Sequence, residues 1–458
     1  MTFTILHGNN LEVLPTLPDN SVDSIVTDPP YELGFMGKKW DSSGIAYSVE
    51  LWTECLRVLK PGGHLLSFGG TRTYHRVAVA IEDAGFEIRD NMAWLYGSGF
   101  PKSLDVSKAI DKAAGAEREV LTESVTDLFG EQKIRKEKAA SGIGENGAAF
   151  SGHAEGAMQK QDTGPATPEA QQWEGWGTAL KPAHEPIIVA RKPLEGTVAH
   201  NVLTHGTGAL NIDGSRIASS SGENFARPVN FTGMNEGWAR PWMQTAEGQA
   251  TNAESRKQSE DKAKKLGRWP ANIILDEHTA GLLDEQSGHL HGSGNISDVE
   301  NDKGKGYESS GYEVSYNGRA NRDFGAKGGG ASRFFYVAKA SKRDRNEGLE
   351  EMPIKRPDNR SSTGMGTFEE KGVQPQQNFH PTVKPTALME YLVKLVTPPN
   401  GTVLDPFTGS GSTGKAAILN GFDFIGIEMT EDYLPIIKAR LQNAEAEFAE
   451  AHADKGLF

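Results

Sequence analysis

Two short segments carry residue types that could bind and activate a substrate. The first reads T-D-P-P-Y over 27–31 and follows the apolar run SIVT (24–27). Two consecutive prolines fix their φ angles and lack N–H groups, so the segment is rigid and its carbonyl groups stay available. Asp28 and the carbonyl of Pro29 can then present two adjacent acceptors beside the ring of Tyr31. This arrangement suits a planar ring with an exocyclic NH2 group, and a simple turn with a surface tyrosine is the alternative.

The second segment is a glycine-rich loop, D-P-F-T-G-S-G-S-T-G-K over 405–415, between an expected strand and an expected helix. Glycine lacks a Cβ, so backbone N–H groups at such a helix start can approach a ligand closely. Gly409, Gly414 and Lys415 match most of a phosphate-binding P-loop. That motif requires Ser or Thr after the lysine to hold magnesium, and Ala416 stands there instead. A P-loop nucleotide hydrolase is therefore the less favoured interpretation.

An acidic residue ends the strand expected after the glycine loop. Glu428 follows Gly411 near the offset of roughly 20 residues at which nucleotide-binding folds place an acid for the ribose hydroxyls. A carboxylate repels phosphate but not an adenosine without phosphates. The loop therefore favours an adenosyl ligand, with a purely structural turn as the alternative.

The segments around both motifs alternate between strand and helix patterns. Strands are expected at 3–6, 24–27, 64–68, 85–96, 185–192, 402–407 and 422–428, and helices at 49–59, up to Ala84, at 386–396, up to Leu419 and at the C-terminus. Such alternation predicts an α/β fold, a parallel sheet with helices on both faces. The alternating parts lie at the two ends of the chain, so the core is expected to combine both ends.

The overall composition limits the classes of partner. At 458 residues the chain has room for roughly two to three domains, and its 53 glycines indicate long loops. A net charge of −13 argues against nonspecific coating of nucleic acid, so DNA would have to meet a local basic patch. Candidate patches lie at 133–138, 256–268 and 339–345, with solvated surface as the alternative.

Cysteine content and hydropathy indicate the compartment. Cys55 is the one cysteine, which excludes an internal disulfide and a cysteine-rich zinc site. No stretch approaches the ~20 apolar residues that span a bilayer, and the N-terminus lacks the plan of a signal peptide. We therefore expect a cytoplasmic protein that has no membrane association.

Together the two segments resemble the S-adenosylmethionine-dependent DNA amino-methyltransferases, the family that modifies adenine N6 or cytosine N4. DPPY (28–31) is similar to the family's catalytic motif, and LDPFTGSGSTG (404–414) resembles its methyl-donor loop. HPTVKP (380–385) resembles the segment beside the methionine part of the donor. The motif order is similar to the family's β arrangement, with a target recognition domain in between. The resemblance covers roughly 1–110, 180–195 and 380–442.

The resemblance implies roles for individual residues. The implied catalytic residues are Asp28, Pro29, Pro30 and Tyr31, and the implied donor-binding residues are Asn9, Asp28, His380, Lys384, Asp405, Phe407, Gly409, Gly411 and Glu428. Asn9 marks a departure, because many relatives carry Gly-Asp near the donor adenine where this chain has Gly8-Asn9. An amide thus replaces an acidic contact there.

The resemblance also implies the organisation of the chain. We expect a Rossmann-like methyltransferase sheet divided into a catalytic half (1–121), a flexible insertion (122–178), a core strand (179–195), a target recognition region (196–379) and an S-adenosylmethionine-binding half (380–458). The recognition region is expected to be largely mobile without DNA. Its plausible DNA-facing residues are Trp238, Arg240, Trp242, Arg268, Trp269, Arg333 and Phe335, although each aromatic could equally anchor a small core.

The implied reaction is methyl transfer to N6 of a flipped-out adenine in double-stranded DNA, with S-adenosylmethionine as donor and no metal. Asp28 at the first motif position favours adenine, and N4 of cytosine is the alternative target. A bacterial or phage-infected cell is the expected setting, and a homodimer and a companion restriction endonuclease both stay open. A catalytically silent DNA-binding protein is a further alternative, which donor binding would exclude.

Overall fold

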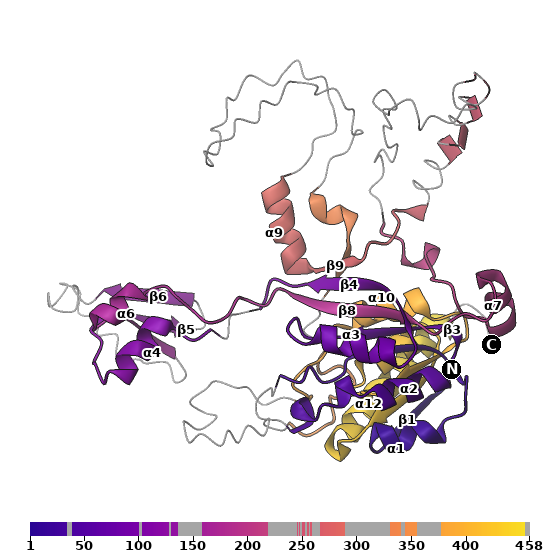
Figure 1. The fold of residues 1–458 in the computed structure, drawn as a ribbon, viewed down its shortest axis with the longest axis horizontal. Coiled ribbons are helices and arrows are strands. Elements are labelled where there is room, and N and C mark those ends of the chain that lie inside the picture. The colour runs from indigo at the N-terminus through magenta and orange to yellow at the C-terminus, as the bar shows by residue number, and fades with distance from the viewer. Residues whose placement is uncertain are drawn as a thin grey trace. The chain divides into compact units, whose positions relative to one another are not determined.

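The computed structural model describes residues 1–33, 39–99, 103–127, 130–135, 158–218, 266–288, 330–339, 344–354 and 377–453, together with scattered positions between 245 and 258. The chain divides into two compact units (Figure 1). Unit 1 comprises Met1–Gly97, His184–Met352 and His380–Phe458, and unit 2 comprises Ser98–Ala183 and Pro353–Phe379. Across the described residues, no helix combines the length and apolar character needed to cross a membrane.

Unit 1 is built on a nine-stranded sheet. Its strands, in sheet order, are β1 (Phe3–His7), β12 (Asp423–Glu428), β11 (Thr402–Asp405), β2 (Val22–Thr27), β3 (Leu59–Phe68), β8 (His184–Arg191), β4 (Glu87–Leu95), β9 (Ile273–Asp276) and β10 (Tyr336–Ala338). Every strand expected from the sequence is present, and the C-terminal strands β12 and β11 lie between the N-terminal strands β1 and β2. The expected α/β core assembled from both ends is confirmed.

One strand departs from the expected parallel arrangement. β8 runs antiparallel to both of its neighbours, β3 and β4, whereas the other neighbouring pairs are parallel. The reason lies in chain order. The chain leaves the sheet after β4, passes through the residues of unit 2, and then enters β8. Leu95 at the end of β4 pairs with His184 at the start of β8, so the chain re-enters the sheet where it left and must run back.

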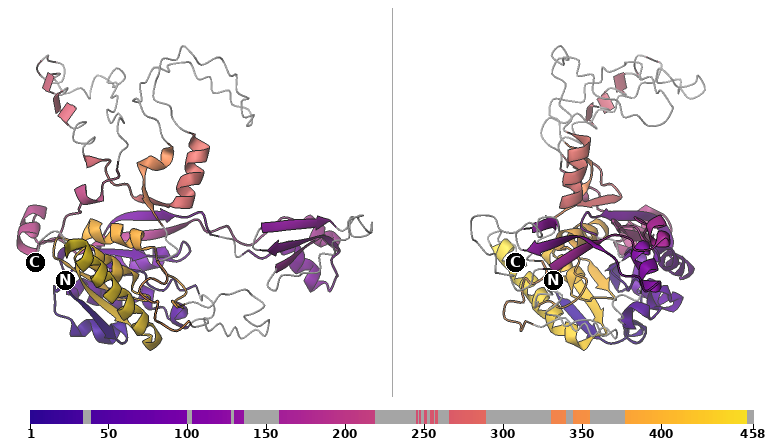
Figure 2. Two further views of the ribbon diagram at one scale, coloured as in Figure 1. Left: turned by 180° about the vertical axis from the view of Figure 1, so that it is seen from behind. Right: turned by 90° about the vertical axis from the view of Figure 1, so that its left-hand side faces the viewer.

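Helices cover both faces of the sheet, as expected. One layer contains α10 (Thr386–Val396), α11 (Ser412–Leu419) and α12 (Leu434–Ala453), and the other contains α1 (Asn10–Val13), α2 (Val49–Val58) and α3 (Tyr74–Asp83) (Figure 2). α11 lies in the connection from β11 to β12, and α2 lies in the connection from β2 to β3. These two connections move in opposite directions along the strand order. Because such crossovers are right-handed, these two connections place their helices on opposite faces.

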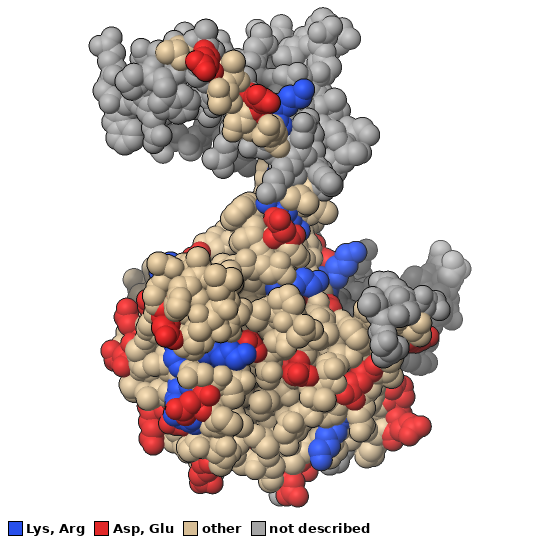
Figure 3. Space-filling model, turned by 90° about the vertical axis from the view of Figure 1, so that its right-hand side faces the viewer, with Lys and Arg blue, Asp and Glu red and all other residues tan. Residues whose placement is uncertain are grey.

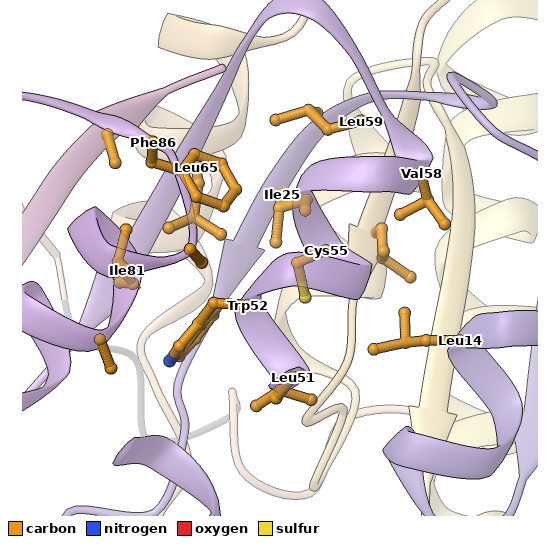
Figure 4. Close-up of a cluster of buried hydrophobic side chains, with 14 of the residues drawn as sticks. Leu14, Ile25, Leu51, Trp52, Cys55, Val58, Leu59, Leu65, Ile81 and Phe86 are labelled. Carbon is orange, nitrogen blue, oxygen red and sulfur yellow. The ribbon is translucent and has the colours of Figure 1, made fainter. Parts of the chain in front are cut away.

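The second layer packs on the sheet through one apolar face of α2. Leu51, Trp52, Cys55 and Val58 are fully buried and meet side chains of β2 and β3, such as Ile25 and Leu65 (Figure 4). The helix begins at an N-cap serine, whose hydroxyl accepts from the N–H of Leu51 at 3.2 Å. Burial raises the pKa of the Cys55 thiol, which therefore stays protonated and packs as a small apolar group.

Unit 2 carries its own small sheet with the order β6-β5-β7, formed by β5 (Val120–Asp127), β6 (Gly130–Arg135) and β7 (Met158–Thr163), and the helices α4 (Val106–Ala113) and α6 (Pro168–Gln172). The range 122–178, which we expected to be a flexible insertion, contains most of β5 together with β6, β7 and α6. Hydrogen bonds substitute for a large core. The buried Asp111 carboxylate accepts from Arg118 at 2.6 Å and from the N–H groups of Ala166 and Thr167 at 3.0 Å each.

The region expected to recognise the target also contributes to the main sheet. β9 and β10 lie at the end of the sheet opposite β1, and α9 (Glu277–Ser287) follows directly after β9. α7 (Val198–His205) packs against β3. Trp238, Arg240 and Trp242, and most of the stretch expected to be mobile, lie outside the described residues.

The buried face of α2 predicts a specific loss of stability. Trp52→Ala should lower the free energy of unfolding by about 3–5 kcal/mol, because it removes a fully buried indole and leaves a cavity. Val49→Ala on the exposed side of the same helix should change it by less than about 0.5 kcal/mol. Urea unfolding of the three proteins measures both values, and equal losses would show that α2 does not use this face for packing.

Candidate functional site

Both sequence motifs lie at the point where the sheet changes its direction of connection. β11 and β2 are parallel neighbours, with Val403 paired to Ser24 and Leu404 to Ile25. After β11 the chain continues toward β12, and after β2 it continues toward β3 on the other side. Open α/β sheets bind their ligands beyond the carboxyl ends of strands at such a point. The structure thus brings 27–31 and 405–415 together from opposite ends of the chain.

A buried hydrogen bond joins the two motifs directly. The hydroxyl of Thr27 donates to Oδ1 of Asp405 at 2.6 Å, and both residues are almost completely buried. The same carboxylate oxygen accepts from the N–H of Phe407 at 3.0 Å, at the start of the glycine loop. Burial raises the pKa of Asp405 to about 6 against the opposing effect of these hydrogen bonds. Asp405 therefore fixes the loop to the end of β2.

Tyr31 is held in place at both its backbone and its hydroxyl. Its carbonyl accepts from the Thr73 hydroxyl at 2.8 Å, and its own hydroxyl donates to Oε2 of Glu185 at 2.8 Å. A Cβ on Gly70 would lie 3.3 Å from the Tyr31 side chain, so the glycine lets the backbone pass close to it. Burial, and then the charges of Asp28 and Glu185, raise the pKa of Tyr31, which keeps the phenol protonated as a donor.

Asp28 presents one used and one unused carboxylate oxygen. Its Oδ2 accepts from Nζ of Lys384 at 2.6 Å. Its Oδ1 is buried and has no hydrogen-bond partner among the described residues. The carbonyl of Pro29 likewise accepts no hydrogen bond from the residues described. A buried acceptor without a donor is costly, so these two neighbouring oxygens suit a ligand that carries an NH2 group.

The structure places Lys384 with the catalytic motif. Its Nζ lies 2.6 Å from Asp28 Oδ2, 3.2 Å from Glu185 Oε2 and 3.2 Å from the Tyr31 hydroxyl. The ammonium also lies over the rings of Phe68 and Tyr31, at 4.7 and 5.4 Å from their centroids. Burial lowers the pKa of Lys384, but the charges of Asp28 and Glu185 outweigh it and the net shift is upward. Lys384 is therefore cationic.

Glu185 was not identified from the sequence as a site residue. It opens β8, which was expected only as a core strand, and it reaches the site because β8 lies beside β3 in the sheet. Trp94 stands directly across the strand pair from Glu185, and Tyr96 follows two residues later. An acid at the start of an otherwise apolar strand is the one signal that could have marked it.

The glycine loop is shaped by Glu428. Its carboxylate accepts from the N–H of Gly409 at 2.9 Å and from the N–H of Thr430 at 2.7 Å, one contact for each oxygen. Gly409 and Gly411 have φ angles of 54° and 78°, a region in which side chains other than glycine are strained. Burial raises the pKa of Glu428 despite these hydrogen bonds. Each carboxylate oxygen retains a lone pair for a further donor such as a ribose hydroxyl.

His380 lies against the glycine loop. A Cβ on Gly409 would meet its Nε2 at 2.9 Å, and its ring packs edge-on against Tyr433 at 4.7 Å. Its Nδ1 lies 2.7 Å from the Thr382 carbonyl. Burial lowers the pKa of His380 to about 4, so the ring is neutral at pH 7 and Nδ1 donates to this carbonyl. His380 can therefore contact a ligand held by the loop.

Arg440 on α12 anchors the loop and was not singled out from the sequence. It is fully buried, and its guanidinium donates to the carbonyl and hydroxyl of Ser410 and to the carbonyl of Asp344. Burial lowers its pKa to about 10, which leaves it charged at neutral pH. Its position among apolar residues of a helix is the sequence signal that could have indicated a buried role.

Three other predicted residues take structural positions. Asn9 caps α1, with its side-chain oxygen accepting from the N–H of Leu11 at 3.1 Å, next to the Gly8 N–H that bonds the carbonyl of Glu428. Phe407 is partly buried against the core. Lys415 is 2% exposed and pairs with Glu347 at 2.8 Å, so it is not presented to a phosphate. This contact weighs further against a nucleotide hydrolase.

Two of the candidate DNA-facing residues meet around one ring. Arg268 and Arg333 lie 4.4 and 4.5 Å from the ring of Phe334, which was not itself a candidate, and the candidate Trp269 is 65% exposed. These residues lie at the amino ends of β9 and β10, whereas Asp28 lies at the carboxyl end of β2. The strands run in the same direction, so the arginines and Asp28 are at opposite ends of the strands. On the face shown in Figure 3, described Lys and Arg side chains are interspersed with Asp and Glu.

The glycine loop and the DPPY segment thus lie at the switch point of an open α/β sheet, the place where such folds bind ligands. The chain belongs to the N6_N4_Mtase family of DNA methylases, whose family model matches residues 22–439. The resemblance of the two motifs to this family is thereby confirmed.

Individual relatives match shorter segments. The type II methyltransferase M.ScaI of Streptomyces caespitosus is 43% identical over 72 residues, 16% of this chain and 23% of the relative. The DNA adenine methyltransferase YhdJ of Escherichia coli K12 is 44% identical over 71 residues, 16% of this chain and 24% of the relative. The chain thus aligns with about a quarter of the length of these curated relatives. A solved structure, the cytosine-N4-specific PvuII DNA methyltransferase, aligns with 98% of this chain and 93% of its own at 12% identity and a TM-score of 0.39.

The raised pKa of Asp405 predicts a pH dependence of stability. Between about pH 4 and 6 the native carboxyl holds a proton that the unfolded one has lost, so wild-type stability should fall as pH rises through this window. Relative to Asp405→Asn, which cannot titrate, the decline should reach about 3 kcal/mol. Urea unfolding of both proteins from pH 4 to 7 measures the difference. Parallel curves would show that Asp405 titrates normally.

Proposed function

We propose that this member of the DNA methylase family transfers a methyl group from S-adenosylmethionine to N6 of an adenine flipped out of double-stranded DNA. The observation that carries the proposal is the buried Oδ1 of Asp28, which has no partner among the described residues and lies next to the Pro29 carbonyl in the chain. An amine with two N–H groups satisfies both oxygens at once. A phosphate or a carboxylate ligand would be repelled there.

The arrangement explains how a weak nucleophile could react. The lone pair of an adenine amino group is delocalised into the ring. Hydrogen bonds from its two N–H groups to Asp28 Oδ1 and the Pro29 carbonyl draw the nitrogen toward tetrahedral geometry and localise the lone pair. A new N–C bond would then form as the methyl–sulfur bond breaks, the sulfonium would leave as a neutral thioether, and the methylated amine would release one proton to water. Positioning and electrostatics supply the catalysis, and no metal is required.

The residues around the loop fit the methyl donor. Gly409 and Gly411 leave the loop N–H groups approachable, and Glu428 can accept from ribose hydroxyls through the lone pairs that its backbone contacts leave. His380, with a neutral ring against Gly409, would border the donor. Asn9 lies near the end of β12 and would face the donor adenine, where its amide could still accept from the amino group.

The target base must leave the helix to reach Asp28. Flipping costs a few kcal/mol, which stacking on an aromatic side chain offsets. Tyr31 is suited to this role, because its ring is fixed by the Thr73 and Glu185 contacts and lies beside Asp28. Pro30 keeps the connection between them rigid.

Adenine is favoured over cytosine by the aspartate at the first motif position. A relative similar over 71 residues is a DNA adenine methyltransferase, which supports the same choice. N4 of cytosine also presents an NH2 group beside a ring nitrogen and is the alternative. We propose that the enzyme acts in the bacterial cytoplasm. A homodimer and a companion endonuclease are compatible with this function but are not required by it.

The first test identifies the product. Wild-type protein incubated with unmethylated DNA and S-adenosylmethionine should yield N6-methyladenine when the DNA is digested to nucleosides and analysed by mass spectrometry. N4-methylcytosine would keep the mechanism and overturn the choice of base. If neither appears on several DNAs although the donor binds, DNA amino methylation is not the activity.

Asp28→Ala should lower kcat for methyl transfer by about 100-fold or more, the scale for loss of a contact to the reacting group. The Kd for S-adenosylmethionine, measured by calorimetry, should stay nearly unchanged. Asp83→Ala, an exposed aspartate at the end of α3, is the matched control and should behave as wild type. A variant at position 28 that retains more than a few per cent of activity would remove Asp28 from catalysis.

A further inference from the structure

A second carboxylate and one ammonium surround Asp28, contributed by segments far apart in the sequence. We propose that Lys384 and Glu185 form a charge-balancing frame that holds Asp28 as a carboxylate with Oδ1 turned to the target amine, and that Lys384 does not bind the methyl donor. The inference rests on the proposed function and adds two positioning residues to it.

The close polar contacts of Lys384 lie within this frame. Its Nζ donates to Asp28 Oδ2 at 2.6 Å and to the Tyr31 hydroxyl at 3.2 Å, and it forms an ion pair with Glu185 Oε2 at 3.2 Å. These contacts direct the ammonium to Asp28, Tyr31 and Glu185 and not to the carboxylate of a methyl donor. The side chain is also 9% exposed, so it cannot turn toward another ligand without breaking these contacts.

The contact with Lys384 explains how the Asp28 carboxylate is oriented. One oxygen accepts from the ammonium, so the carboxylate cannot rotate freely, and the other oxygen is buried with no partner in the part of the chain that the structure describes. Tyr31 is fixed by the same frame, because its hydroxyl donates to Glu185 and accepts from Lys384. The frame therefore sets the acceptor oxygen and the stacking ring relative to each other.

The charges of the frame sum to −1, from two carboxylates and one ammonium. Loss of the ammonium would leave two carboxylates in a mostly buried site, which favours protonation of one of them. A protonated Asp28 has an O–H in place of an acceptor lone pair and would no longer polarise the amine. The other titratable groups that face the frame are Tyr31, Tyr96, His380 and Asp405. The phenols stay protonated and the imidazole neutral at pH 7, so none can replace the ammonium.

The test compares Lys384→Met with Lys384→Met/Glu185→Gln. The single variant changes the charge of the site from −1 to −2, and the double variant returns it to −1. We measure kcat against pH with saturating DNA and S-adenosylmethionine, and the donor Kd by calorimetry. The acidic limb of the kcat profile should move upward by at least about one pH unit in Lys384→Met, a tenfold loss of kcat on that limb. The double variant should move the limb back toward wild type.

The donor Kd should stay within about threefold of wild type in both variants. A donor Kd raised by about tenfold or more, with an unshifted pH profile, would show that Lys384 binds the donor and overturn the inference. A double variant with the same shifted limb as the single variant would also overturn it, because charge balance would not be the cause. If Lys384→Met does not fold, Glu185→Gln still tests the charge, because it removes one carboxylate and keeps the ammonium: its acidic limb should lie at or below that of wild type. An upward shift in Glu185→Gln would contradict the frame.

These outcomes separate the inference from the proposed function. If wild type methylates no DNA, the proposed function fails whatever the variants do. If wild type is active and the limb does not move in Lys384→Met, the function stands and the frame is wrong.

Discussion

The parallel pairing of β11 with β2 is the constraint on which the molecule depends. It joins strands from the two ends of the chain, and at their carboxyl ends the Thr27 hydroxyl donates to the buried Asp405 carboxylate at 2.6 Å. This contact places the glycine loop beside the DPPY segment, although 378 positions separate the two residues. The sheet reverses its direction of connection between these strands, so both motifs open to the same side. The proposed site for a methyl donor and a target amine rests on that geometry.

Burial of charge is the second theme of the site. Asp28, Glu185 and Lys384 lie together with little exposure, and each carboxylate has a contact with the ammonium. In the glycine loop, Arg440 donates to the carbonyl of Ser410 and Glu428 accepts from the N–H of Gly409. Buried ion pairs of this kind add little stability in general but specify a unique arrangement in some proteins. In the proposed mechanism, the ion pair with Lys384 uses one oxygen of Asp28 and leaves the other, Oδ1, to accept from the ligand.

Much of the core could be predicted from the sequence, because local patterns determine it. The spacing of Trp52 and Cys55 indicated α2, and apolar runs bounded by turns indicated the strands. Asp28 and Gly409 were recognisable because their motifs are continuous in the chain. Glu185 and Arg440 were not, since each acts through contacts with residues more than 25 positions away. Lys384 was found by its motif but assigned to the donor, and its contact with Asp28 depends on the folded sheet. The small sheet of unit 2 was missed because its polar sequence carries no strong periodicity, and hydrogen bonds around Asp111 hold it instead.

The most direct measurement is a crystal structure of the protein with a nonreactive donor analogue and DNA that contains its target base. The account predicts that the exocyclic nitrogen lies about 2.7–3.2 Å from both Asp28 Oδ1 and the Pro29 carbonyl, with the base stacked on Tyr31. It also predicts that Lys384 still contacts Asp28 Oδ2. An amine held by other acceptors, with Asp28 Oδ1 turned away from it, would contradict the account.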